Sequence, residues 1–118
     1  MTTDYSDTEG AAATRRVLDQ DRPPTAVVYD NDVMAAARVA VAAARGLTIP
    51  RDLSIVAWED SVLCRMVHPW LTALARDTIA FGKSAAEQLT DLLDGGPARS
   101  VQLALPEPVV RESTAPPV

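Results

Sequence analysis

Cysteine, histidine and positive charge are all scarce in this sequence. One cysteine, Cys64, excludes an internal disulfide, and with a single histidine it leaves too few ligands for a typical metal site. The 11 basic residues are outnumbered by 16 acidic ones, which gives a net charge of −5. That balance argues against direct nucleic-acid binding by this chain, because such binding needs a concentrated basic surface.

Long apolar runs and glycine-rich loops are missing as well. No apolar stretch approaches the ~20 residues of a membrane span, and the N-terminus lacks the basic and apolar regions of a secretory signal. No glycine-rich phosphate loop follows a predicted strand, which argues against a dinucleotide enzyme. We therefore expect a cytoplasmic globular protein without a cofactor, and 118 residues allow one domain at most.

The most informative stretch is 25–45. Its first part, AVVY at 26–29, predicts a short strand buried on both faces. Acids and an amide at 30–32 end the strand and can cap a helix over 33–45. Gly46 suits the left-handed residue that closes such a helix.

The helix over 33–45 carries little charge. Between Val33 and Ala44 only Arg38 is charged, and the rest is Val, Met and Ala. A helix that is apolar nearly all round is buried on more than one side. It is therefore either part of a subunit interface or an interior helix of a larger domain.

The remaining elements complete an α/β pattern. Ser6 and Glu9 form a capping box before a helix that we expect to reach Gln20. A second buried strand, SIVAW at 54–58, makes a strand–helix–strand unit with the first, so Val27 and Ile55 should lie side by side in a parallel sheet. Further along we expect helical turns at 61–67, a strand at 71–75, a helix at 78–94, and extended segments at 101–105 and 108–111.

Polar side chains follow both predicted strands at their carboxyl ends, where ligands of open parallel sheets sit. They are Asp30, Asn31, Asp32, Glu59 and Asp60. Such groups hydrogen-bond the hydroxyls of a sugar-like ligand, and Tyr5 or Trp58 could stack on its apolar face. Alternatively, Asp32 and Asp60 are simply helix or turn caps. Cys64 and His68, four residues apart, suggest a nucleophile and base, but a buried cysteine and a surface histidine explain them better.

Several stretches, in this order, resemble the LacI/GalR family of bacterial transcription regulators. They are Asp4, Tyr5 and Ser6 with Gly10; PTAV at 24–27 with Asn31, Asp32, Met34 and Ala35; RGLTIPRDLSIV at 45–56; Pro69, Leu71 and Thr72; Gly82; and Leu105 and Pro106 with REST at 111–114. The resemblance covers nearly the whole chain.

The resemblance implies a three-layer parallel-sheet α/β sandwich of the periplasmic-binding-protein type I kind. Residues 1–118 would be the C-terminal part of its effector-binding domain, without the DNA-binding helix-turn-helix and most of the N-terminal lobe. The implied function is to bind a small effector, a sugar or nucleobase-like metabolite, and so modulate operator binding by the absent headpiece. The implied protein is a homodimer, not an enzyme, and does not contact a membrane.

The resemblance also assigns roles to individual residues. Tyr5 resembles the aromatic that stacks on the effector, and Asn31 the amide that bonds it. Glu59 and Asp60 take the places of two family acids, and Arg76 or Thr78 lies where the chain returns to the N-terminal lobe. Family dimer surfaces match the helix after Asp32 and the segment 61–68, which selects Met34, Ala35, Arg38, Val39, Ala42, Cys64 and Val67 as interface residues.

Two other classes of protein remain open. A secreted solute-binding protein would share the fold, although the missing signal sequence and the REST ending argue against it. A small α/β enzyme could use Glu59 or Asp60 as its base. It would then need a complete pocket within this chain and a carboxyl group with a raised pKa.

Overall fold

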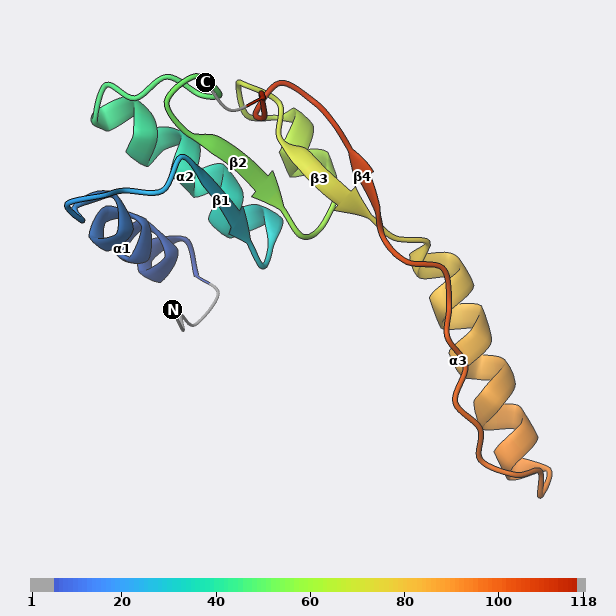
Figure 1. The fold of residues 1–118 in the computed structure, drawn as a ribbon. Coiled ribbons are helices and arrows are strands. Elements are labelled where there is room, and N and C mark those ends of the chain that lie inside the picture. Colours follow the sequence, from blue (N-terminus) through green and yellow to red (C-terminus); the bar gives the residue numbers. More distant parts are fainter. Residues whose placement is uncertain (1–5, 117–118) are drawn as a thin grey trace. The chain divides into compact units, whose positions relative to one another are not determined.

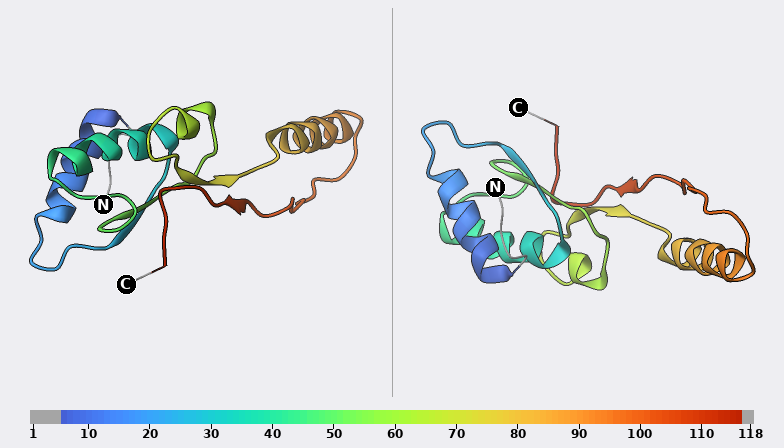
Figure 2. Two further views of the ribbon diagram at one scale, coloured as in Figure 1. Left: turned by 90° about the horizontal axis from the view of Figure 1, so that it is seen from above. Right: turned by 90° about the horizontal axis from the view of Figure 1, so that it is seen from below.

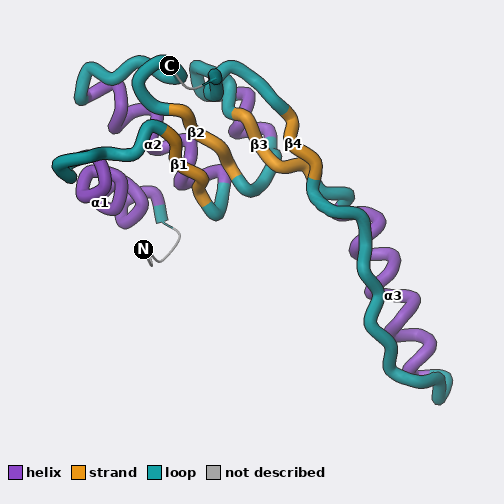
Figure 3. Tube along the Cα trace, viewed as in Figure 1, coloured by secondary structure: helices purple, strands orange, loops and turns teal. Residues whose placement is uncertain are grey.

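The computed structural model describes residues 6–116 and divides into two compact units. The first unit holds the residues up to Ala75 and those from Pro108 onward, and the second is 76–107. Figure 1 shows the elements of both units along the chain, and Figure 3 separates helices, strands and loops by colour.

The first unit is built on a parallel strand–helix–strand unit. Strand β1 (Ala26–Tyr29) leads into helix α2 (Asp32–Ala44), which returns to strand β2 (Ser54–Ala57). The two strands pair in parallel with Val27 opposite Ile55, as predicted. Strand β3 (Thr72–Ala75) continues the sheet in parallel beside β2, and β4 (Glu107–Val109) completes the order β1-β2-β3-β4.

All helices of the first unit lie on one face of this sheet (Figure 2). They are α1 (Asp7–Leu18), α2 and the 3₁₀ helix η1 (Val62–Arg65). The core between them and the sheet includes Tyr29, Leu53, Ile55, Ala57 and Ala73. The described part of this unit therefore supplies two of the three expected layers.

The prediction that the first strand is buried on both faces is wrong. Val28 is 58% exposed and Ala26 is also exposed, whereas Tyr29 is buried. Val28 points away from the helices because successive side chains of a strand alternate between faces. In addition, β1 is the first strand of the sheet, so its outer edge has no neighbouring strand among the described residues.

Local sequence signals place the helix ends. The Ser6 hydroxyl accepts from the Glu9 amide at 3.1 Å, which confirms the first half of the capping box, although α1 ends at Leu18 rather than Gln20. Helix α2 begins after Asn31, whose side-chain oxygen accepts from the Met34 amide at 2.8 Å. Gly46 then takes a positive φ of 69°, which a residue with a Cβ rarely adopts.

The second unit consists of α3 (Thr78–Leu93) and the segment that follows it. Asp77 caps the helix by accepting from the Ala80 amide at 2.8 Å. No residue of α3 is buried, and large apolar side chains of this helix are exposed, including Ile79, Phe81 and Leu93. Of the two extended segments expected after it, only the second yields a strand, β4.

The segment 111–114 fastens strands β2 and β3 together. Ser113 is fully buried, and its hydroxyl donates to the Ile55 carbonyl at 2.5 Å and accepts from the Thr72 amide at 2.8 Å. The Ile55 amide in turn donates to the Ser113 carbonyl at 2.9 Å. Ser113 thus hydrogen-bonds to Ile55 as a neighbouring strand residue would. It does so next to Thr72, where β3 begins.

Candidate functional site

The parallel register brings the predicted polar residues of the first unit together. Tyr29 lies opposite Ala57, so the segments after β1 and β2 leave the sheet at the same edge. Asn31 and Asp32 begin α2 there, and Glu59 and Asp60 lie in the loop from β2 to η1. The prediction that these residues follow the carboxyl ends of two neighbouring parallel strands is therefore confirmed. The contacts of each side chain determine which groups are available to a ligand there.

Asn31 and Asp32 act in part as helix caps. The Asn31 side chain accepts from Met34, as described above, and Asp32 Oδ1 accepts from the Val33 amide at 2.8 Å. Asp32 Oδ2 also accepts from the Ser61 hydroxyl, and Ser61 caps η1. Asp32 therefore joins the start of α2 to the start of η1, which supports the capping interpretation for this residue.

Asp60 is an ion-pair partner in this structure, and the ligand contact that the resemblance implied for it stays a prediction. Its Oδ2 lies 2.8 Å from Arg111 Nη2, and its Oδ1 is buried, 3.9 Å from Arg65 Nη1. The Asp60 side chain is 17% exposed and that of Arg111 is 10% exposed. One carboxylate oxygen is thus paired with Arg111 and the other is buried beside Arg65.

Besides Asp30, which is also exposed, Glu59 is an accessible acid of the edge. It is exposed, and its carboxylate makes no hydrogen bond or ion pair with any residue in the described range 6–116. Its backbone carbonyl accepts from the buried Cys64 thiol at 3.5 Å. Trp58 beside it is 43% exposed, and its amide donates to the Tyr29 carbonyl at 2.8 Å. An exposed acid and an exposed aromatic residue are thus adjacent in the chain at the end of β2.

The other predicted ligand residues belong to the second unit or fall outside the described residues. Arg76 and Thr78 are exposed and belong to the second unit, where Thr78 is the first residue of α3. Tyr5 lies outside the described residues. The structure therefore brings Asn31 and Glu59 to one edge of the first unit, and the roles of Tyr5, Arg76 and Thr78 stay predictions.

Most of the predicted dimer interface is core. Five of the seven residues are buried within the chain itself: Met34, Ala35, Arg38, Ala42 and Cys64. Val39 and Val67 are half-buried and pack against the same core. The five buried residues do not form an outer surface in this structure, because they pack inside the first unit. An interface role for the half-buried Val39 and Val67 stays a prediction. The apolar side chains that do face outward here are Val33 (44% exposed), Val62 (62%) and Met66 (74%).

The burial of Arg38 was not foreseen. Its guanidinium lies over the Tyr29 ring, 5.2 Å from the centroid, and the residue is fully buried. A Cβ added at Gly10 would come within 2.1 Å of Arg38 Nη2, so α1 approaches α2 closely only because Gly10 has no side chain. The lone charge in an apolar helix was the available signal, and the resemblance assigned this residue to the dimer interface.

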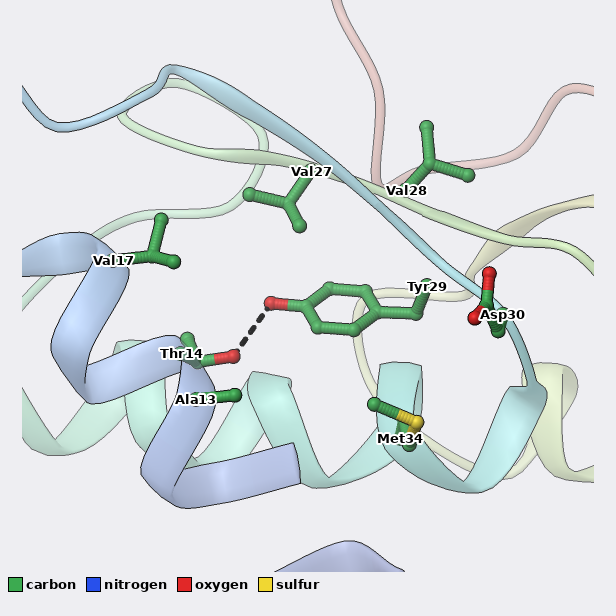
Figure 4. A pocket seen from close by; sticks show the side chains of 8 residues that line it. All are labelled: Ala13, Thr14, Val17, Val27, Val28, Tyr29, Asp30 and Met34. Carbon is green, nitrogen blue, oxygen red and sulfur yellow. Dashed lines mark hydrogen bonds between the residues drawn. The ribbon is translucent and has the colours of Figure 1, made fainter. Parts of the chain in front are cut away.

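A cavity of about 340 Å³ opens beside β1 (Figure 4). Its walls come from α1, β1 and the start of α2: Ala13, Thr14, Val17, Val27, Val28, Tyr29, Asp30 and Met34. The Tyr29 hydroxyl points across it to Thr14 Oγ1 at 2.8 Å, and burial raises the pKa of Tyr29. The walls include Asp30 of the polar edge but neither Asn31 nor Glu59, so the cavity adjoins that edge at the end of β1.

The nucleophile–base interpretation finds no support. Cys64 is buried and the His68 side chain is 88% exposed, as the alternative predicted. Within residues 6–116 no three metal-ligating side chains cluster, and no helix is long and apolar enough to cross a membrane.

Comparisons with known proteins identify the family to which this fold belongs. The family described as a periplasmic binding protein-like domain matches residues 1–114. The transcriptional regulator MalR of Streptomyces coelicolor is 37% identical over 107 residues, which cover 90% of this chain and 30% of that protein. A LacI family regulator from Bifidobacterium animalis subsp. lactis superposes with a TM-score of 0.93 and 42% identity, over 100% of this chain and 44% of that one.

A further solved structure contains a sugar. It is the complex of the transcriptional regulator CelR with cellobiose, at a TM-score of 0.83 and 32% identity, covering 93% of this chain and 34% of that one. The chain therefore belongs to the periplasmic binding protein-like domain family, in the form that LacI-family transcription regulators contain. It spans less than a third of the length of MalR, so it corresponds to one part of such a regulator.

Proposed function

We propose that this chain is one wall of the effector site of a LacI-type transcription regulator. The observation that carries the proposal is the exposed Glu59 carboxylate at the edge where β1 and β2 end, beside the half-exposed Trp58. A carboxylate accepts hydrogen bonds from sugar hydroxyls, and an aromatic ring packs on the apolar face of a sugar. The relative crystallised with cellobiose makes a sugar the favoured effector class.

The remaining contacts in the proposed site are Asn31 from the same edge, together with Tyr5, Arg76 and Thr78. The effector would shift the equilibrium between two arrangements of a larger protein and so alter DNA binding by a headpiece outside this chain. The net charge of −5 supports the view that these residues do not contact DNA themselves. We expect no catalytic turnover and a cytoplasmic location.

Titration calorimetry with cellobiose and a panel of other sugars and nucleosides tests the proposal. We expect binding of at least one compound, and Glu59→Gln should weaken it about tenfold, because a hydrogen bond to a charged group contributes about 1.5–3 kcal/mol. Glu87→Gln is the matched control, since Glu87 is an exposed acid on α3. Equal affinity of Glu59→Gln and the unchanged chain would refute the assignment of Glu59.

We further propose that the chain self-associates through Val33, Val62 and Met66. Val33 lies in α2, Val62 lies in η1, and Met66 directly follows η1. The hydrogen bond between Ser61 and Asp32 joins the start of η1 to the start of α2. Light scattering after size-exclusion chromatography should give a dimer, and Met66→Asp should give a monomer. Val101→Asp, at an exposed apolar residue of the second unit, should leave the dimer intact.

A further inference from the structure

The loop between β2 and η1 is held on both sides of Glu59. Before it, the Trp58 amide donates to the Tyr29 carbonyl at 2.8 Å. After it, Asp60 pairs with Arg111, and the Ser61 hydroxyl bonds Asp32. The loop is therefore bonded to β1, to α2 and to the segment after β4, and Asp60 lies directly between Glu59 and the start of η1.

The pair between Asp60 and Arg111 is the longest-range of these attachments. Arg111 Nη2 donates to Asp60 Oδ2 at 2.8 Å and Nη1 donates to the Leu71 carbonyl at 2.7 Å. The Arg111 amide also donates to Thr72 Oγ1 at 2.9 Å. The guanidinium is thus fixed against the start of β3 while it holds the loop after β2. Because both side chains are largely buried, losing one partner leaves the other uncompensated, unlike at an exposed pair.

The two partners connect different parts of the molecule. Arg111 lies two residues after β4, in the segment that returns from the second unit. Asp60 lies between Glu59 and η1, and its other oxygen is 3.9 Å from Arg65 of η1. Val62 and Met66, the exposed apolar residues of the proposed dimer surface, lie within or directly after η1.

We propose that Asp60 and Arg111 are positioning residues that couple the returning segment after β4 to the loop carrying Glu59 and to the surface around η1. A displacement of this segment would be transmitted through the guanidinium to Asp60, and from there to Glu59 on one side and Met66 on the other. The inference rests on the proposed function only in assigning Glu59 to the effector and Met66 to the dimer.

Hydrogen exchange of the full chain in Asp60→Asn, Arg111→Met and the double variant tests the coupling. We expect each single variant to raise the hydrogen-exchange rate of the backbone amides of 58–66 about tenfold. Expressed as a free energy, this change lies within the range of coupling energies between residues in contact. The double variant should raise the rate little further. Exchange in α1 should not change. Arg111→Lys keeps the positive charge but cannot donate to both Asp60 and the Leu71 carbonyl in the geometry of the guanidinium. It should therefore raise the exchange of 58–66 less than Arg111→Met does. The control is Asp19→Asn, which breaks the exposed pair with Arg45.

Two results would overturn the inference. One is unchanged exchange of 58–66 in both single variants. The other is an increase spread evenly over the chain in proportion to lost thermal stability, as expected of a merely structural pair. The dissociation constant of the dimer is a separate measurement: Asp60→Asn should raise it if the coupling reaches Met66. A wild-type chain that is monomeric refutes the dimer proposal alone, and the exchange of 58–66 still decides the coupling.

Discussion

Replacing Ser113 by Ala removes one oxygen from the junction between β2 and β3. That oxygen has two partners, because it donates to the Ile55 carbonyl and accepts from the Thr72 amide. Ser113 has no solvent exposure, so water cannot replace the lost hydroxyl without opening the junction. The Ser113 backbone would still accept from the Ile55 amide, which keeps the segment near its place.

The expected loss follows from the two groups left unpaired. A buried donor or acceptor that loses its partner costs about 1–3 kcal/mol, so leaving two such groups unpaired should lower the free energy of unfolding by about 2–6 kcal/mol. That is a large share of the ~5–15 kcal/mol typical of a native domain. The change in volume is only one oxygen atom, so no cavity term of comparable size competes with the hydrogen-bond term.

Urea unfolding followed by tryptophan fluorescence measures this loss, because Trp58 and Trp70 flank the junction in sequence. Ser100→Ala is the control, at an exposed serine, and should change the free energy by less than about 0.5 kcal/mol. If Ser113→Ala also changes it by less than about 0.5 kcal/mol, the hydroxyl is not buried between two strands and the proposed fastening of β2 to β3 is wrong.

Two further predictions concern α2 and β1. Asn31→Ala removes the acceptor for the Met34 amide and should lower the free energy of unfolding by about 1 kcal/mol, whereas Asn31→Asp retains the acceptor and should lose little in the same urea titration. Burial raises the pKa of Tyr29 more than its hydrogen bond with Thr14 and the nearby Arg38 charge lower it. Because the folded-state pKa then exceeds the unfolded value of about 10, stability is intact below that pH and falls as the pH rises above it. Tyr29→Phe should remove that part of the alkaline loss, and an equal loss in both proteins would contradict the burial of the phenol.

The sequence alone determined the order and type of most elements. The lengths of the apolar runs at 26–29 and 54–58, with a helical stretch between them, predicted the parallel pairing of Val27 with Ile55. Caps at Ser6 and Asn31 were readable because a cap is a local interaction, made between residues three positions apart. The common edge of Asn31 and Glu59 followed from the same topology.

Only the tertiary structure decided which side chains are available at that edge and on α2. Asp60 is taken by Arg111, 51 positions away, and Ser113 reaches Ile55 across 58 positions. The apolar helix around Arg38 gave no indication of which face meets the sheet, because small side chains cover it nearly all round. The local sequence pattern determines backbone conformation because it acts between residues that are close in the chain. Burial and side-chain pairing depend on segments that come into contact only in the folded protein. The periodicity of a single sequence does not show which segments these are.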